Sequence, residues 1–481
     1  MTPFAGAGLT HPNDAFMLRR ARFGQWTPLL VLVCASAAAV LAETLVPEDM
    51  ERYWLALAGD WTLAHGRILE ALQGSWYPAR PWVDQEWLVA VATAWMRAHG
   101  LYALLELLFA GSLIFGICFV AFETIRTRTH PLVACAQVAV SGLGAVFFAQ
   151  DRAQTLVWIL LPALILAWRR VPWATVPLVA LWANVHGSFP VAILWMLLHL
   201  DRRRIAPLIV AALATLANPL GWRLWAFTVV LARNAKLAGY VNEWTPAFLS
   251  VTGALVTVAA LAPFWLRLLA GLRLRRPVKY GDLLFVAASA VGTLVAVRYS
   301  MLLVLTSATT LGDAFRTRAR PLPFATVATS MTFSALILAL AARSFATVPV
   351  VADPWFRNLE RGVVFGACAP LVRDRRVFSD TLEVGNLVEM AGGTANVDGR
   401  IDAFPRRAIV DSATVLTDRP NAERIADRSG AQMLIIKGTF QPSPHRWRFE
   451  QRCYNVRLYA RKGVRRFPRR RSLLTQFTRS G

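Results

Sequence analysis

The sequence has little charge for its length, and negative charge is the scarcer kind. Charged residues make up 17% of the 481 residues, with 29 Asp and Glu against 52 Lys and Arg, so the formal net charge is +23. Soluble domains carry about 25% charged and about 45–50% apolar residues, whereas 56% of this chain is hydrophobic. Such a composition excludes intrinsic disorder. Long apolar runs separate the basic clusters, so we predict no nucleic-acid partner.

Cysteine is also scarce. The five cysteines contain no Cys-x-x-Cys pair, which argues against a zinc site or a disulfide framework; they are Cys34, Cys118, Cys135, Cys368 and Cys453. No His or Cys has the spacing of metal ligands, so we assign no metal site and no cofactor, and leave a need for a divalent cation open. A signal-peptide pattern is missing, because the first apolar run begins near Pro28 and no small-residue cleavage site follows it.

Apolar runs dominate the first two thirds of the chain. A membrane-spanning helix needs about 20 apolar residues, with a range of about 17–25, and about eleven runs qualify as candidates. They lie at about 28–46, 101–122, 131–149, 154–168, 173–187, 188–200, 205–217, 248–266, 282–297, 299–315 and 322–342. The shorter segment 86–98 is predicted to be a helix that lies at the membrane interface. The sequence thus predicts a polytopic α-helical membrane domain over residues 28–342, preceded by a cytoplasmic segment at 1–27.

Basic clusters occur at alternate connections between the predicted spans. They hold 18 of the 52 Lys and Arg residues, at Arg19/Arg20/Arg22, Arg126/Arg128, Arg169/Arg170, Arg202/Arg203/Arg204, Arg267/Arg273/Arg275/Arg276/Lys279 and Arg316/Arg318/Arg320. The positive-inside rule places this side in the cytoplasm. The N-terminus is then cytoplasmic, and an odd number of spans places everything after about residue 343 outside.

After about residue 343 the composition becomes that of a soluble segment. Short strands are predicted at 363–367, 375–380, 395–400, 407–412 and 432–438, with helical segments at 382–393 and 426–432. We therefore predict a small extracytoplasmic α/β domain over residues 343–462, in which Cys368 and Cys453 could pair. The basic tail at 463–481 has no acid and is either a solvated segment or a contact for anionic lipid headgroups.

Carboxylates and tryptophans gather in the predicted first external loop, residues 47–100. Glu48, Asp49 and Glu51 directly follow the first span, and Asp84 and Glu86 come later in the loop. A carboxylate beside aromatic walls can accept a proton from a bound hydroxyl, although a solvated charge is the simpler interpretation of any single one. Six tryptophans fit either an interfacial belt or platforms for sugar rings or lipid; they are Trp54, Trp61, Trp76, Trp82, Trp87 and Trp95.

Two arginines lie at predicted external ends of spans. Arg152 is followed by Gln154, and Arg298 stands in a short polar turn. An arginine beside apolar spans needs a partner or a polar cavity. Each is therefore either one half of a structural ion pair or a cation for a phosphate, which the guanidinium recognises well.

Two further polar groups stand on the same predicted face. Asn184 and His186 form a compact turn, which is either structural or a contact to a phosphate or sugar hydroxyl. Glu243 precedes Trp244, and this pair is a further candidate for a site because the same order occurs in the first loop.

Taken together, these residues form a pattern that resembles a set of bacterial polytopic membrane proteins, similar to the GT-C class of glycosyltransferases, which use polyprenyl-phosphate sugars. The motifs are Glu51-x-Tyr53-Trp54, Gly59-x-Trp61, Glu86-Trp87-Leu88, Arg152-x-Gln154, Trp182-x-Asn184-x-His186-Gly187, Asn218-Pro219-x-Gly221-Trp222 and Glu243-Trp244-x-Pro246. The run 377–400 also resembles the extracytoplasmic domain of those proteins.

The resemblance implies a GT-C-like glycosyltransferase of the bacterial inner membrane. It would transfer a sugar from a polyprenyl-phosphate donor to an envelope or lipid-linked acceptor, a glycan or a lipid, at the external face of the bilayer. Asp49 or Glu51 would act as base, and Arg152, Arg298 and His186 would stabilise the leaving lipid phosphate. The other residues implied in substrate binding are Glu48, Trp54, Asp84, Glu86, Trp87, Gln154, Asn184, Glu243 and Trp244.

Two other classes of protein fit the same composition. A transporter or flippase-like protein would have essential charges at mid-span depth, where Glu106 is the main candidate acid. A non-catalytic scaffold of an envelope-polysaccharide assembly system would tolerate neutral substitutions at Asp49, Glu51 and Arg152.

The predicted orientation is tested by reporter fusions at residues 65, 128 and 400. We expect these positions to report outside, inside and outside, because residue 128 lies in a basic connection and the other two do not. The reversed pattern would contradict the orientation and the placement of the site with it.

Overall fold

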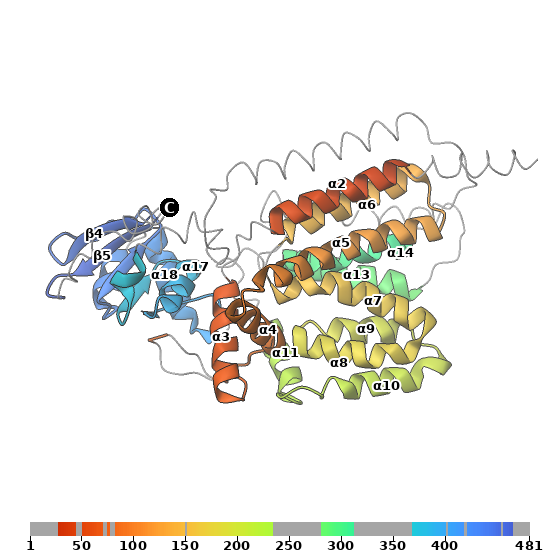
Figure 1. Ribbon diagram of the computed structural model, residues 1–481, viewed down its shortest axis with the longest axis horizontal. Helices are drawn as coiled ribbons and strands as arrows, with labels where there is room; N and C mark the ends of the chain where they lie inside the picture. Colours follow the sequence, from red (N-terminus) through yellow and green to blue (C-terminus); the bar gives the residue numbers. More distant parts are fainter. Residues whose placement is uncertain are drawn as a thin grey trace, which may run out of the picture.

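The computed structural model describes residues 27–44, 51–70, 75–76, 82–149, 152–233, 280–311, 368–400, 403–417, 421–453 and 456–464. These residues form an apolar helical bundle and a small α/β domain (Figure 1). Two helices of the first loop, α3 (Glu51–His65) and α4 (Trp87–Ala98), lie between the two parts.

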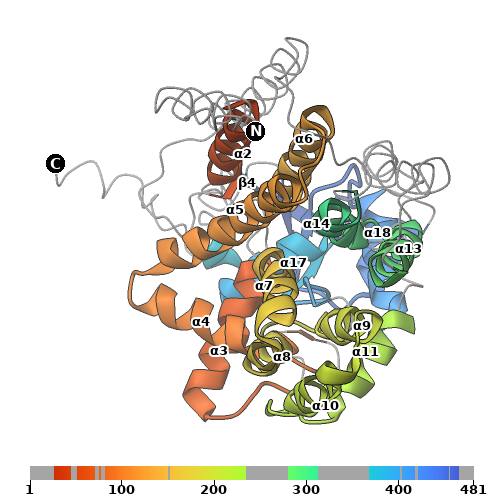
Figure 2. The same ribbon diagram turned by 90° about the vertical axis from the view of Figure 1, so that its right-hand side faces the viewer.

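The bundle consists of helices that run side by side, as Figure 2 shows by viewing many of them nearly end-on. In the described part of the chain they are α2 (Thr27–Thr44), α5 (Tyr102–Arg126), α6 (Pro131–Phe147), α7 (Val157–Arg170), α8 (Thr175–Val185), α9 (Pro190–Leu198), α10 (Ile205–Ala214), α11 (Arg223–Arg233), α13 (Tyr280–Val295) and α14 (Ser300–Leu311). Proline at the first or second position starts α6 and α9, where its missing N–H leaves no hydrogen bond unmade.

The predicted spans coincide with helices wherever the structure describes them. Nine of the eleven runs do so, and the runs 248–266 and 322–342 lie outside the described residues. Among the described residues, however, only Ala103–Arg126 is long and apolar enough to cross a membrane by itself. Helices α8, α9 and α10 have 11, 9 and 10 residues, so they are about 14–17 Å long. That is about half of a hydrocarbon core of about 30 Å, and the prediction of about eleven spans is not confirmed.

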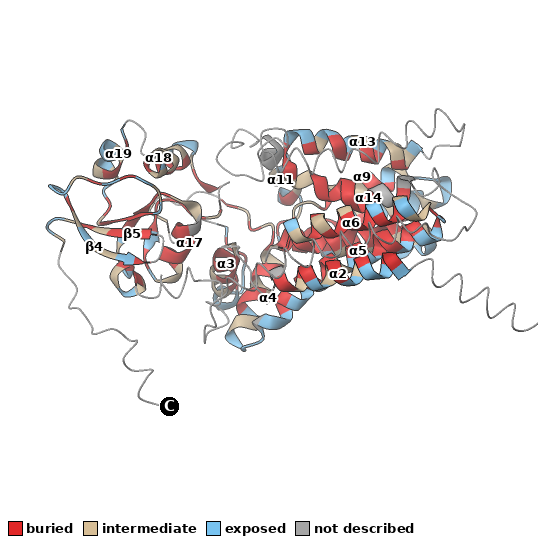
Figure 3. Cartoon of the chain, turned by 90° about the horizontal axis from the view of Figure 1, so that it is seen from above, coloured by how far each residue is buried: buried red, intermediate tan, exposed pale blue. Residues whose placement is uncertain are grey.

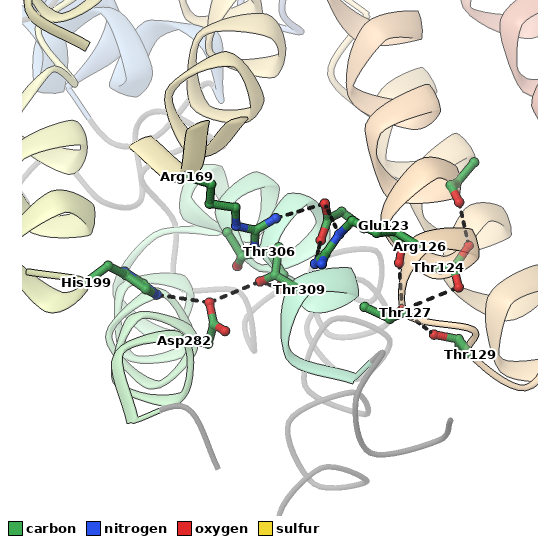
Figure 4. Close-up of polar contacts among 11 residues, drawn as sticks. Glu123, Thr124, Arg126, Thr127, Thr129, Arg169, His199, Asp282, Thr306 and Thr309 are labelled. Carbon is green, nitrogen blue, oxygen red and sulfur yellow. Dashed lines mark hydrogen bonds and ion pairs between the residues drawn. The ribbon is translucent and has the colours of Figure 1, made fainter. Parts of the chain in front are cut away.

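Polar side chains tie the helices together at one end of the bundle (Figure 4). The buried carboxylate of Glu123 accepts hydrogen bonds from Arg126 at 2.7 Å and from Arg169 at 2.9 Å. Nearby, His199 Nε2 lies 3.0 Å from Asp282 Oδ1. These contacts bring two of the predicted basic connections to the same end, and the side of the membrane that this end faces stays a prediction.

The other end of the bundle is covered by the first loop. Helix α4 confirms the helix predicted at 86–98, whereas α3 was not predicted and crosses the ends of the bundle helices (Figures 1 and 2). The two helices touch at Gly59, where an added Cβ would lie 2.0 Å from the carbonyl oxygen of Ala90. Only glycine permits so close an approach of two backbones.

The C-terminal domain contains a five-stranded mixed sheet in the order β2-β1-β3-β5-β4. Its strands are β1 (Arg376–Ser379), β2 (Thr394–Ala395), β3 (Met433–Ile436), β4 (Trp447–Cys453) and β5 (Val456–Arg461), and its helices are α17 (Leu382–Met390), α18 (Arg406–Leu416) and α19 (Ala422–Arg428). Strand β1 pairs in parallel with β2 and β3, and β5 is antiparallel to both β3 and β4. Figure 3 shows the domain beside α3, with α3 between the domain and the helical bundle.

The strand predictions for this domain were partly wrong. The predictions at 375–380 and 432–438 are confirmed by β1 and β3, and the helix predicted at 382–393 is confirmed by α17. The helical segment predicted at 426–432 is confirmed only as far as Arg428, where α19 ends. The predicted strand at 407–412 is instead part of α18, and that at 395–400 is a strand only as far as Ala395. In α18 the buried residues Ala408, Ile409, Ser412 and Val415 follow the spacing of a helix, a period that outweighs the strand preference of Ile and Val. The predicted strand at 363–367 lies outside the described residues.

Cys368 and Cys453 form a disulfide that links the first described residue of the domain to the end of β4. The two half-cystines are 85 residues apart in sequence. Disulfides persist in oxidising compartments, so the pairing agrees with the predicted extracytoplasmic position of this domain.

Alkylation of the unfolded chain tests the disulfide. Without reductant we expect three cysteines to be labelled, namely Cys34, Cys118 and Cys135, and with reductant all five. The mass increase gives the count, and a Cys368→Ser variant serves as the control, since it should release Cys453 for labelling. Five labels without reductant would contradict the pairing.

Candidate active site

Polar side chains from five segments meet where α3 covers the end of the bundle. These segments are the start of α3, the turn before α4, the 3-10 helix η1 (Ala153–Leu156), the turn between α8 and α9, and the 3-10 helix η7 (Val297–Tyr299). All five are helix ends or turns, so their side chains do not have to enter the apolar interior of the bundle.

Glu51 and Arg152 form an ion pair in this region. The distance from Arg152 Nη1 to Glu51 Oε1 is 3.6 Å, and the two side chains are 19% and 26% exposed. Glu51 stands in the first turn of α3, where the helix dipole stabilises a carboxylate. A partly solvated pair of this kind is worth about 1 kcal/mol or less. That Arg152 binds a phosphate stays a prediction.

Gln154, two residues after Arg152, binds a second arginine. Arg298 Nη2 donates to Gln154 Oε1 at 2.9 Å, and Gln154 Nε2 donates to Met301 Sδ at 3.7 Å. The segment that carries Arg152 is therefore in contact with the segment that carries Arg298. The structure thus pairs Glu51 with Arg152 and Gln154 with Arg298, and Arg152 and Gln154 are two residues apart in the sequence.

His186 lies against Glu86. The Nε2 atom of His186 is 3.3 Å from Glu86 Oε1, and both side chains are buried. The backbone N–H of Ser188 donates to His186 Nδ1 at 3.1 Å, so Nδ1 is an acceptor and the ring proton of a neutral His186 is on Nε2. The proton therefore points toward the Glu86 carboxylate. Arg298 is also close enough for its charge to act on His186.

Asn184 and Trp87 join α4 to the bundle. Trp87 Nε1 donates to Asn184 Oδ1 at 3.0 Å, and Asn184 Nδ2 donates to the carbonyl oxygens of Ala180 and Ala217 at 2.8 and 2.9 Å. These contacts use the amide of Asn184 to hold three segments in place, so its main role in this structure is to position its neighbours.

Two other predicted binding residues are buried in the protein. Asp84 Oδ1 accepts the backbone N–H of Glu86 at 3.1 Å, which closes the turn before α4. The Trp54 ring meets the Trp82 ring edge to face, with 5.5 Å between the centroids, and it packs against Gly399 of the C-terminal domain. Both side chains shape the loop, and neither lies open to solvent.

Some predicted site residues are not described by the structure. Glu48, Asp49, Glu243 and Trp244 lie outside the described residues, so their roles stay predictions. Glu106, the acid considered for a transporter, lies in the second turn of α5, close to an end of that helix. Among the described residues, no group of three or more His, Cys, Asp or Glu side chains could hold a metal ion.

The sequence analysis missed several residues around the site. Gln85 covers Gly187, because a Cβ added to Gly187 would meet Gln85 Oε1 at 1.8 Å. Glu70 accepts Arg223 at 3.1 Å and so ties the first loop to α11. Arg400 packs over the Trp82 ring at 5.7 Å. Of these residues, only Arg400 lies in a sequence motif that could have indicated a role, because the run 377–400 resembles the extracytoplasmic domain of GT-C-like proteins.

No known protein-family model and no curated protein matches the chain. Solved structures do match, and two of them are of the archaeal oligosaccharyltransferase AglB from Archaeoglobus fulgidus. One, a complex with an inhibitory peptide and a dolichol-phosphate, matches at a TM-score of 0.52 and 12% identity, over 86% of this chain and 70% of that one. The other, in the apo form, matches at 0.51 and 13%, with the same coverage. The fold is therefore similar to that of a GT-C-type glycosyltransferase, while such low identity shows the fold alone.

The two carboxylates of the site should differ in their effect on stability. Glu86→Ala would leave the buried Nε2–H of His186 without its acceptor, which we expect to lower the free energy of unfolding by about 2 kcal/mol. Glu51→Ala removes half of a partly solvated pair and should cost less than about 1 kcal/mol. Unfolding of the detergent-solubilised full chain measures both, and equal costs would contradict the burial of the Glu86–His186 pair.

Proposed function

We propose that the chain is a membrane glycosyltransferase. It transfers a sugar from a polyprenyl-phosphate donor to an envelope or lipid-linked acceptor at the external face of the bacterial inner membrane. One observation carries the proposal: in a fold similar to that of a GT-C-type glycosyltransferase, Glu51 pairs with Arg152 at one end of an apolar bundle, and Gln154, two residues further on, binds Arg298.

The reaction needs a base and a stabilised leaving group. Asp49 or Glu51 takes the proton of the acceptor hydroxyl, whose oxygen forms a bond to the anomeric carbon of the sugar. The bond between that carbon and the phosphate oxygen breaks, and its electron pair leaves with the lipid phosphate. Arg152 and Arg298 stabilise the charge that develops on this oxygen, because fixed cations lower the barrier most where new charge appears.

The remaining residues bind and orient the substrates. His186 Nε2 lies 3.3 Å from the carboxylate of Glu86, which faces the sugar together with Trp87 in our proposal. Glu243 and Trp244 are proposed to complete the sugar pocket. A donor dissolved in the bilayer reaches this end of the bundle from the side, which accounts for a site at helix ends and turns.

The proposal is tested by comparing lipid-linked sugars and envelope glycans in a deletion strain and in strains with single substitutions. Asp49→Asn, Glu51→Gln, Arg152→Ala and Arg298→Ala should each be assayed. We expect the substitution of the true base, and of at least one arginine, to lower the transfer rate about 100-fold. The loss of a general base typically reduces a rate by this factor. Lipid-linked sugar should accumulate in the same strains.

A matched control is Arg203→Ala. Arg203 is exposed in the 3-10 helix η3 (Arg202–Arg204), beyond the far end of α9, so its loss should not alter the products. Unchanged glycans in the deletion strain would contradict the enzyme proposal and favour a different role for the bundle.

A further inference from the structure

The turn at residues 82–86 lies between the candidate site and the C-terminal domain. Its first residue, Trp82, is buried, and the backbone N–H of Trp82 donates to the carbonyl of Glu70 at 3.0 Å. Its last residue, Glu86, faces His186. A shift of Trp82 would therefore be transmitted over four residues to the site.

Arg400 of the C-terminal domain lies against Trp82. Its guanidinium carbon is 5.7 Å from the centroid of the Trp82 ring, within the range of a cation–π contact. The side chain of Arg400 is 1% exposed. Such a desolvated cation binds an aromatic face more strongly than an exposed one does.

Arg400 is itself held in one orientation by two carboxylates. Its Nε atom donates to both oxygens of Asp398 at 3.1 Å, and its Nη2 donates to Glu389 Oε2 at 2.7 Å. Burial raises the pKa of Glu389 well above its ordinary value, and the Asp398 charge raises it further, while Arg400 opposes the shift. The planar fork of arginine suits this pair of acceptors, which a lysine would bind less rigidly.

Apolar contacts complete the junction on both sides of the turn. Trp54, Leu55 and Trp82 of the first loop share one buried cluster with Val397 and Phe404 of the domain. A second connection lies nearby, where Ser75 pairs with Ala395 and Arg376 packs 4.4 Å above the Trp76 ring. The first loop thus contacts the C-terminal domain at two places, around Trp82 and at residues 75–76.

We propose that Arg400 is a positioning residue for the candidate site, acting through Trp82 to hold the turn at residues 82–86 so that Glu86 faces His186. That this site is catalytic rests on the proposed function, whereas the mechanical coupling stands on the contacts alone. The competing explanation is that apolar packing holds the turn without help from Arg400.

Cross-linking across the turn measures its position directly. A Cβ built on Gly187 lies 3.7 Å from the Cβ of Gln85, within the range of about 3.5–4.5 Å that a disulfide needs. The double variant Gln85→Cys/Gly187→Cys should therefore cross-link under a mild oxidant. The full chain is used, with Cys34, Cys118 and Cys135 changed to Ser and the native disulfide kept.

The positioning variants are compared for their rate of cross-linking. We expect Arg400→Ala and Trp82→Leu each to slow it about ten-fold, because a buried cation–π contact is lost, and Arg400→Lys to restore part of the rate. Trp82→Leu leaves the ion cluster of Arg400 intact, so it tests the contact even if Arg400→Ala destabilises the domain. Arg448→Ala is the matched control, since Arg448 pairs with Glu450 on β4.

The outcomes separate this proposal from the proposed function. Equal cross-linking rates in all variants, or lost transfer in Arg400→Ala with an unchanged rate, would overturn the positioning role. A rate that depends on Arg400 supports it even if the deletion strain keeps its glycans, in which case only the proposed function fails.

Discussion

The structure depends on the contact between α3 and α4 at Gly59. With no side chain at Gly59, the backbone of α3 lies against that of α4, and α3 can cross the ends of the bundle helices at close range. This crossing places Glu51 beside Arg152 at one point and Trp54 beside the C-terminal domain at another. A larger residue at Gly59 would move both contacts, because α3 carries them on one rigid helix.

The two ends of the bundle use charge in different ways. At the end away from the C-terminal domain, Glu123 is fully buried and bonded to two arginines, so its charge is neutralised and its position is set. At the covered end, the pair of Glu51 and Arg152 is longer and partly exposed. A buried ion pair is costly to break, whereas an exposed one is cheap to rearrange. The first therefore suits a structural role, and the second suits an exchange of partners with a ligand.

The sequence predicted the positions of most bundle helices. It identified candidate residues for the site, but not which of them lie together. Apolar runs located nine helices, because a helix that is apolar on all sides is visible in the sequence as a continuous apolar stretch. Helix α3 was missed since its polar residues Asp60 and His65 conceal a buried face formed by Tyr53, Ala56 and Gly59. In α18, the strand preference of Ile409 and Val410 led to a strand prediction, although the buried residues are spaced as in a helix.

The charged members of the site were found as candidates, and an ion pair was one expectation for Arg152, but its partner was not identified as Glu51. Glu51 and Arg152 are about a hundred residues apart, and nothing local indicates that they pair. Nothing local indicates the pairing of Glu86 with His186 either, or that of Trp82 with Arg400, which lie still further apart in the sequence. These pairings depend on how the first loop and the C-terminal domain pack at the end of the bundle, which is a property of the tertiary structure and not of any segment.

The pairing of Ser75 with Ala395 has a consequence for how the protein is made. The first loop leaves the ribosome early, yet its partner in the sheet is synthesised only after the bundle, and chains tend to fold from the N-terminus as they emerge. The growing helical bundle therefore contains Glu51, Arg152 and Arg298 well before the turn at residues 82–86 has its contact with Arg400. The contacts between the first loop and the C-terminal domain can therefore form only after the whole bundle has been synthesised.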